Sequence, residues 1–122
     1  MTLPGPGTLA WFEVATDDPD TAQKFYGNLF DWTFVPEADG FDYRNIKAAD
    51  AERPMGGILG TSGKQPNHAV FYIVVADIEA TCAEAVRLGG SVISKELDGV
   101  PALAHLRDPA GNHFGIFTQP GD

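Results

Sequence analysis

The residue with the clearest chemical potential in this sequence is Glu13, a carboxylate within the apolar segment Trp11-Phe12-Glu13-Val14. A carboxylate that loses its water among apolar neighbours has a raised pKa and can act as a general base, or it stays charged and pairs with a cation. The alternative needs no function, because the carboxylate could be exposed or paired with Arg44 or Arg107. Both interpretations stay open at this point.

The three histidines, His68, His105 and His113, show none of the short fixed spacings of a local metal motif. We therefore expect surface or hydrogen-bonding histidines, and we keep His105 and His113 as candidate polar contacts of a ligand. An iron site of two histidines and one carboxylate, which a ring-cleaving dioxygenase needs, has no support for the same reason.

The sequence shows no other catalytic constellation. Ser62 and Ser91 lack the context of a nucleophile elbow, and Gly56-Gly57 is too short for a phosphate loop. These glycines more simply allow close backbone approach or strand curvature. Cys82 is the single cysteine and cannot form an internal disulfide, and its place on the apolar face of an expected helix indicates packing.

Length and composition limit the classes of function. The chain has 122 residues, 43% of them hydrophobic and 20% charged, which is typical of one globular domain. No apolar run approaches the roughly 18 residues of a membrane span, and the start does not resemble a secretory signal, so a soluble cytoplasmic protein is expected. The formal charge of -9 disfavours nucleic acid as a partner. An acidic surface suits a cationic small molecule, although it also serves solubility.

The elements that must position these residues occur twice along the chain. In the first half, Asp18 can cap a helix that Pro19 begins, and Asp31 stands where a left-handed residue closes it. In the second half, Asp77 caps a helix that Gly89-Gly90 stops. Alternation and turn residues predict strands at 9–16, 32–35, 41–47, 55–59, 70–75, 91–95, 102–107 and 113–118.

Matching Trp11-Phe12-Glu13-Val14 to Phe71-Tyr72-Ile73-Val74 gives an internal repeat with a displacement of 60 residues. The sequence thus predicts an α+β fold of two tandem βαβββ modules in a single domain, 1–122. Module 1 would span about 8–60, a loop 60–67, and module 2 about 68–119.

Each module would have one sheet face covered by its helix and one bare face, and the two bare faces would enclose a cleft. By period-two alternation, the covered faces should hold Phe12, Val14, Tyr72, Val74, Phe114 and Ile116. The residues expected to face the cleft are Trp11, Glu13, Phe71, Ile73, His113, Gly115 and Phe117.

Several motifs, in order, resemble the small actinomycete-type members of the glyoxalase, bleomycin resistance protein and dioxygenase superfamily, also called vicinal oxygen chelate proteins. They are 11–18 and 25–32 in the first half, the helix 77–90 with its double glycine, and the turn Arg107-Asp108-Pro109-Ala110-Gly111-Asn112-His113-Phe114. The resemblance covers nearly the whole chain. It implies paired, curved, mixed sheets around a cleft, a bacterial protein and often a homodimer.

The resemblance also implies where a metal would be held. Metal-dependent relatives place His, Gln or Glu early in the first strand and on the last strand of each module. The matching positions here hold Trp11, Phe71 and Gly115, and the fourth falls in Met55-Gly56-Gly57-Ile58. None of these offers a donor suited to a divalent metal, so we expect no metal and no other cofactor.

Three functions are compatible with this sequence. The first is a metal-free protein that binds a small, partly aromatic or cationic molecule, as drug-sequestering relatives do. The second is a glyoxalase-like lyase or isomerase with Glu13 as general base, assisted by His113 or His105. The third is an interaction module whose apolar cleft holds a second copy or another protein. The expected ligand contacts are Trp11, Glu13, Phe71, Ile73, His105, His113 and Phe117.

Overall fold

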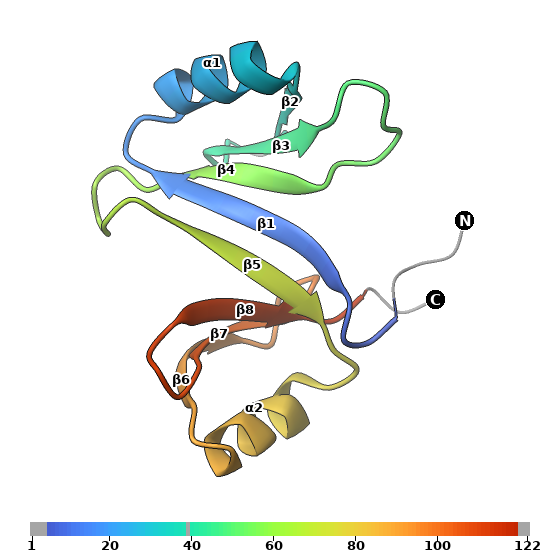
Figure 1. The fold of residues 1–122 in the computed structure, drawn as a ribbon, viewed down its shortest axis with the longest axis vertical. Coiled ribbons are helices and arrows are strands. Elements are labelled where there is room, and N and C mark those ends of the chain that lie inside the picture. Colours follow the sequence, from blue (N-terminus) through green and yellow to red (C-terminus); the bar gives the residue numbers. More distant parts are fainter. Residues whose placement is uncertain (1–4, 39, 120–122) are drawn as a thin grey trace. The chain divides into compact units, whose positions relative to one another are not determined.

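The computed structural model describes residues 5–38 and 40–119. It divides into two compact units. The first unit consists of residues 11–70, and the second consists of the described residues 5–10 and 71–119. The strands form one mixed eight-stranded sheet, and each half of the chain contributes four neighbouring strands and one helix, as Figure 1 shows. The two βαβββ modules of an α+β fold are therefore confirmed.

The first module consists of β1 (Leu9–Thr16), α1 (Pro19–Phe30), β2 (Thr33–Pro36), β3 (Tyr43–Lys47) and β4 (Gly56–Gly60). Its strand order is β2-β3-β4-β1, in which β1 and β4 are parallel and the other two pairs are antiparallel. The last strand of the module thus lies between its first and third strands. Side chains of β3 can reach β1 only by crossing β4.

Helix α1 begins and ends as its sequence predicts. The Asp18 carboxylate accepts hydrogen bonds from the backbone N–H of Thr21 at 3.1 Å and from its hydroxyl at 2.8 Å. Asp31 closes the helix with a φ of 59°, in the left-handed region.

Side chains on one face of the first-module sheet hold α1 in place. The Phe12 ring contacts Trp32, with ring centroids 5.7 Å apart, and Trp32 stacks on Tyr26 of the helix. Arg44 of β3 donates hydrogen bonds to Asp20 at 2.7 Å and to Gln23 at 3.0 Å, both on α1. This face of the sheet is therefore the helix face, and the neighbouring positions Trp11 and Glu13 point to the opposite side.

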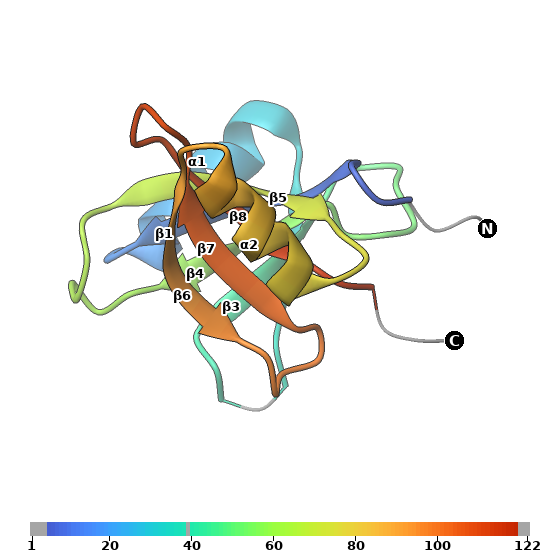
Figure 2. The ribbon, with the colours of Figure 1, turned by 90° about the horizontal axis from the view of Figure 1, so that it is seen from below.

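The second module repeats the same topology. It consists of β5 (His68–Val74), α2 (Ile78–Arg87), β6 (Ser91–Glu96), β7 (Leu103–Arg107) and β8 (His113–Phe117), in the order β5-β8-β7-β6. Strands β5 and β8 are parallel, and the other pairs are antiparallel. Figure 2 shows α2 lying across its sheet. The buried core of this module consists of Ile78 and Cys82 of α2 and of Ala104, Leu106 and Ile116 of the strands.

The predicted faces of β5 are wrong. Ile73 packs against the core under α2, and the ring of Phe71 stacks on Phe114 at a centroid distance of 6.2 Å. Phe71 and Ile73 thus lie on the helix face, whereas Tyr72 and Val74 pair with Gly115 and Phe117 on the other side. The run from Val70 to Val75 is apolar at every position, so its pattern does not show which residues face inward. A shift of one residue exchanges the two faces of a strand.

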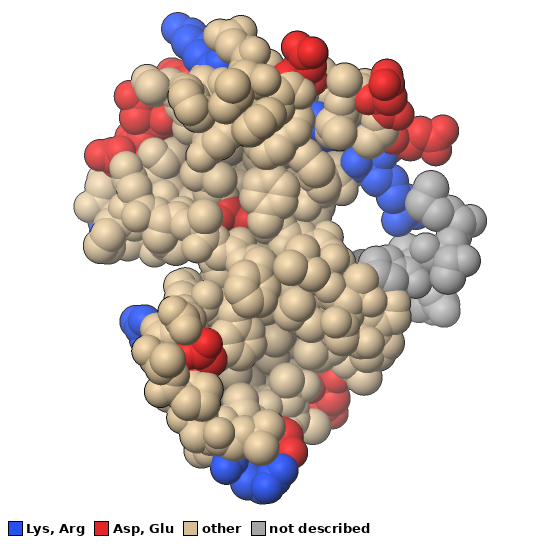
Figure 3. All heavy atoms as spheres, in the orientation of Figure 1, with Lys and Arg blue, Asp and Glu red and all other residues tan. Residues whose placement is uncertain are grey.

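The distribution of charge agrees with the acidic composition. In the view of Figure 3, the Lys and Arg side chains form separate groups with Asp and Glu between them. No helix in the described ranges is long and apolar enough to cross a membrane.

Candidate functional site

Each sheet has a face opposite its own helix, which we call its helix-free face. On this face each module gathers a small cluster of polar and aromatic side chains. The first-module cluster is Trp11, Glu13 and Tyr43. The second-module cluster is Tyr72, His105 and His113, with Phe117 beside them. Both clusters come from strands, so the sheets hold them in place.

In the first-module cluster, the hydroxyl of Tyr43 connects Trp11 with Glu13. The indole N–H of Trp11 donates a hydrogen bond to this hydroxyl at 2.9 Å. Burial raises the pKa of Tyr43, and the hydrogen bond with the negative Glu13 carboxylate raises it further, while the Trp11 contact lowers it. The phenol therefore stays neutral and donates a hydrogen bond to the Glu13 carboxylate. The result is a carboxylate anchored beside an indole ring.

Gly57 makes this arrangement possible. Tyr43 belongs to β3, Trp11 and Glu13 belong to β1, and β4 runs between them. Neighbouring strands are about 4.8 Å apart, so a side chain that reaches two strands away must lie flat on the strand between. A Cβ atom at Gly57 would collide with the Tyr43 ring. The glycine is thus required by the tyrosine that lies over it.

The second-module cluster is a chain of three hydrogen-bonding side chains. The Tyr72 hydroxyl lies 3.4 Å from His105 Nε2, and His105 Nδ1 lies 2.8 Å from His113 Nε2. The ring of Tyr72 also meets His105 and Phe117 edge to face, at centroid distances of 5.6 and 6.4 Å. One polar path therefore runs from Tyr72 on β5 over β8 to His105 on β7, and from there back to His113 on β8.

Gly115 has the same role here as Gly57 has in the first module. Tyr72 of β5 reaches His105 of β7 across β8, and Gly115 is its direct partner on β8. A Cβ atom at Gly115 would collide with the Tyr72 ring. The two modules use the same packing, although the tyrosine stands on the third strand in one and on the first strand in the other.

The turn before β8 fixes the position of His113. The Asp108 carboxylate accepts backbone hydrogen bonds from Ala110 and Asn112, each at 2.9 Å, and a side-chain hydrogen bond from Asn112. These bonds lower the pKa of Asp108, the contacts from Asn112 most strongly. The carboxylate therefore stays charged near neutral pH and holds the turn that leads directly into His113.

The structure places five of the seven expected ligand contacts on helix-free faces. Trp11 and Glu13 lie together on the first sheet, and His105, His113 and Phe117 lie together on the second. The other two, Phe71 and Ile73, face α2, so the prediction that they face the cleft is wrong. The suggested pairing of Glu13 with Arg44 is also wrong, because Arg44 binds Asp20 on the helix face.

Sequence reasoning missed both tyrosines. Tyr72 was expected on the covered face, and Tyr43 was not considered. The available signal was the presence of glycine inside two predicted strands, at 57 and 115, since an interior strand glycine often marks a place where another group approaches closely.

These residues do not fit the metal site that the family resemblance implies. On the last strand of each module, the tyrosine rings occupy the space above Gly57 and Gly115 into which a donor side chain would project. On the first strands, Trp11 lies on the helix-free face and Phe71 is turned toward α2. In residues 5–38 and 40–119, no group of three or more His, Cys, Asp or Glu side chains is placed to hold a metal ion.

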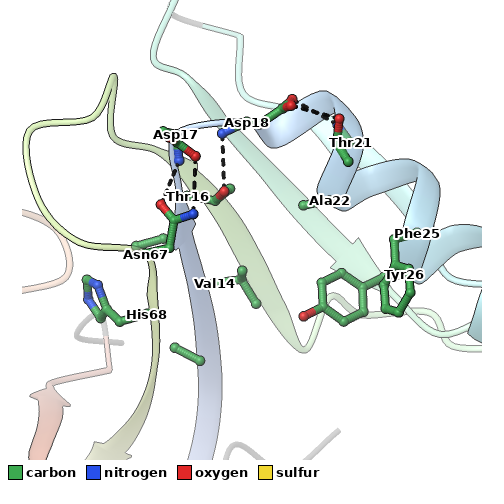
Figure 4. Close-up of a pocket in the computed structure, with 12 residues that line it drawn as sticks. Val14, Thr16, Asp17, Asp18, Thr21, Ala22, Phe25, Tyr26, Asn67 and His68 are labelled. Atoms are coloured by element: carbon green, nitrogen blue, oxygen red, sulfur yellow. Dashed lines mark hydrogen bonds between the residues drawn. The ribbon is translucent and has the colours of Figure 1, made fainter.

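A shallow hollow of about 550 Å³ lies elsewhere in the first unit, at the end of β1 and the start of α1 (Figure 4). Its polar side chains serve local structure. Asp17 and Asn67 exchange two hydrogen bonds at 3.0 and 3.1 Å, and Asp18 caps α1. The remaining lining includes Val14, Ala22 and Phe25. The hollow is therefore best described as the junction between β1 and α1.

The chain belongs to the glyoxalase-like domain family, whose model matches residues 11–117. This match and the fold together confirm the vicinal oxygen chelate superfamily. The protein is 39% identical over 120 residues to "Putative glyoxylase CFP32" of Mycobacterium tuberculosis, covering 90% of this chain and 43% of that protein.

Two further relatives differ in how much of their length the chain covers. A "Glyoxylase-like domain-containing protein" of Didymella fabae is 29% identical, with 94% of this chain and 96% of the relative covered. "Anthracycline biosynthesis protein DnrV" of Streptomyces peucetius is 28% identical, with 98% and 50% covered. The chain thus spans about half the length of CFP32 and DnrV.

Solved structures share the fold at low sequence identity. Methylmalonyl-CoA epimerase from Mycobacterium tuberculosis superposes with a TM-score of 0.62 at 14% identity, covering 99% of this chain and 94% of the epimerase. The protein BH1468 from Bacillus halodurans superposes with a TM-score of 0.67 at 13% identity, covering 95% and 96%. An epimerase from Streptomyces coelicolor, in complex with 2-nitronate-propionyl-CoA, reaches 0.65 at 15% identity, covering 96% and 100%.

Proposed function

We propose that this protein binds a small, planar, partly aromatic molecule on a helix-free face without a metal ion, and that a cationic group on the ligand pairs with Glu13. The observation that carries this proposal is the first-module cluster, in which the neutral Tyr43 hydroxyl fixes the Glu13 carboxylate beside the Trp11 indole. An aromatic surface with one fixed carboxylate suits a planar cation, because the ring offers stacking and cation–π attraction while the carboxylate offers charge.

The names of the relatives support a small-molecule role. Two of them are named for anthracycline biosynthesis, and the epimerase neighbour was solved with a coenzyme A ester. Anchored aromatic and polar groups on rigid strands are what such ligands need.

The test follows the indole N–H of Trp11 by NMR. The chain has two tryptophans, so its spectrum holds two indole signals, and Trp32→Phe assigns them. The probes are N-methylquinolinium, a planar cation, and naphthalene, which is neutral and of similar shape. We expect saturable shifts of the Trp11 signal with both probes and tighter binding of the cation, while Trp32 on the helix face stays unchanged. If neither probe shifts the Trp11 signal saturably, the proposal is wrong.

Glu13→Gln and Tyr43→Phe separate the parts of the cluster. Because Gln keeps the shape and removes the charge, we expect Glu13→Gln to weaken N-methylquinolinium binding about three- to tenfold and to leave naphthalene binding unchanged. Tyr43→Phe keeps the ring over Gly57 but releases the carboxylate, so a smaller loss for the cation is expected. Equal losses for both probes would show that charge has no part in binding.

A second candidate is an isomerase or lyase with Glu13 as general base, which the epimerase neighbours favour through the shared fold. The contacts of Glu13 argue for the binding role. The Tyr43 hydroxyl holds the Glu13 carboxylate beside the Trp11 indole, which is a suitable place to pair with a planar cation. Turnover of a thioester or α-hydroxycarbonyl substrate that is lost in Glu13→Gln, with substrate binding retained, would favour the enzyme instead. The homodimer implied by the family resemblance stays a prediction, which light scattering after size exclusion would check.

A further inference from the structure

We infer that Phe41 is a specificity-determining residue of the first-module site, whose exposed ring stacks on the second ring of a bicyclic or larger planar ligand. The inference rests on the proposed function and defines the size class of the ligand. Such a ligand has at least two fused aromatic rings, one beside Glu13 and Trp11 and one over Phe41. All of these residues belong to the unit of residues 11–70.

Phe41 extends the aromatic surface of the first-module cluster. Its ring is parallel to the ring of Tyr43, with an interplanar angle of 4° and a centroid distance of 5.5 Å. Carbon atoms in contact are about 3.5–4.0 Å apart, so parallel rings at this centroid distance are displaced sideways and form a step. The Tyr43 ring lies over Gly57 on the helix-free face, and the Phe41 ring continues this flat surface.

The backbone around Phe41 holds its ring in this position. The N–H of Tyr43 donates a hydrogen bond to the carbonyl of Phe41 at 2.8 Å, which closes a three-residue turn and brings the two rings together. Asp42, the residue between them, accepts a hydrogen bond from the Gly60 N–H at 2.8 Å. The Tyr43 carbonyl accepts another from the Glu37 N–H at 3.0 Å. A ring on an anchored backbone loses little conformational entropy when a ligand stacks on it.

Exposure alone does not distinguish Phe41 from other surface side chains. Phe41 is 58% exposed and Phe25 of α1 is 59% exposed, and single exposed apolar residues are normal on a protein surface. The difference is the neighbouring ring. Phe25 meets Tyr26 edge to face, at 81°, whereas Phe41 is parallel to Tyr43, whose hydroxyl holds the cluster together. A planar ligand can therefore stack on Phe41 and still reach the cluster.

The number of rings decides how much of this surface a ligand covers. A single-ring cation can lie beside Glu13 and Trp11 without reaching Phe41, whereas a fused second ring extends over the step. Stacking needs flat apolar area and no charge. Phe41 therefore selects for ring number and Glu13 selects for charge, so the two contributions can be separated by experiment.

The experiment compares N-methylquinolinium, N-methylpyridinium and naphthalene in NMR titrations of the Trp11 indole signal. Phe41→Leu keeps an apolar side chain and removes the ring. We expect this variant to weaken binding of the two bicyclic probes about three- to tenfold, as for loss of an aromatic contact, and binding of N-methylpyridinium by less than about twofold. Phe41→Tyr keeps the ring and should retain the wild-type dissociation constants.

Phe25→Leu is the matched control, because it removes a ring of nearly equal exposure from α1 of the same unit. It should leave all three dissociation constants unchanged. Equal losses for the one-ring and two-ring cations in Phe41→Leu, or no loss for either, would overturn the inference while the proposed aromatic site stands.

Light scattering checks a different occupant of this surface. If Phe41→Leu lowered the molar mass in solution without changing the affinity for any probe, a second copy of the chain would cover Phe41, and the inference would be wrong. If none of the three probes binds the wild type, the proposed function itself has failed.

Discussion

Tyr72 and Gly115 are direct partners across the parallel pair of β5 and β8, and the tyrosine ring occupies the space that a side chain at position 115 would need. Tyr43 and Gly57 show the same packing across β3 and β4, two positions out of direct register. In both modules a glycine that looks like a gap in the sequence is a contact surface in the fold. The first prediction tests this contact.

Gly115→Ala should lower the free energy of unfolding by about 1–3 kcal/mol, because the added methyl group forces the Tyr72 ring out of its place. Urea unfolding measures the change. The control is the same substitution in a Tyr72→Val background, where no ring lies over position 115 and the cost should be much smaller. Equal costs in both backgrounds would mean that the ring is not the obstacle.

Alkaline pH should destabilise the protein through Tyr43. Burial and the nearby Glu13 raise its pKa in the folded state, whereas an unfolded tyrosine ionises near pH 10. The contribution of this group to stability is therefore fully present below about pH 10 and is lost as the pH rises from there toward the folded pKa. The free energy of unfolding, measured by urea at neutral and alkaline pH, should fall less in Tyr43→Phe than in wild type. The same slope in both proteins would contradict the assignment.

Asp31→Gly should stabilise the protein by up to about 1 kcal/mol, because glycine adopts a left-handed backbone without a Cβ clash. Asp31 has a φ of 59°, and its N–H bonds the carbonyl of Gly27 at 3.0 Å to close α1. The melting temperature of the variant is the measurement. Asp31→Ala is the comparison and should be less stable than wild type, since alanine tolerates this conformation less well. A lower melting temperature for Asp31→Gly would show that the Asp31 side chain is needed for another contact.

Cys82 should resist thiol reagents in the folded protein. It is 2% exposed in the core under α2, and burial raises the pKa of its thiol, so little thiolate is present or accessible at neutral pH. The rate of reaction with a disulfide reagent should rise many-fold once urea unfolds the chain. A native rate similar to that in urea would show that α2 opens readily.

Local chemistry made the elements predictable. Asp18, Pro19 and Asp31 mark the start and end of α1 because caps depend on neighbouring residues only, and the structure shows each of them in its predicted place. The strands were found within a few residues for the same reason. Cys82 was expected to pack and lies in the core.

The site was harder to predict, because it depends on which residues of each strand face the helix and which face the other side. In β1, Glu13 breaks the apolar run and fixes which residues face the helix, so Trp11 and Phe12 were assigned to the correct sides. In β5 no polar residue breaks the run from Val70 to Val75, and the repeat was aligned one residue out of phase. Tyr72 was lost from the predicted site for that reason. The contact between His105 and His113 depends on the pairing of β7 with β8, which sequence spacing alone does not reveal.

The tyrosine packing over glycine also bears on how such a protein could evolve. A new side chain at Gly115 or Gly57 collides with a ring, and loss of the ring alone opens a hole above a bare strand, so either change is harmful unless the other accompanies it. Related proteins that differ at one of these pairs must have replaced the tyrosine and the glycine together, or passed through a less stable intermediate. Substitutions at each pair should therefore be inherited as a unit.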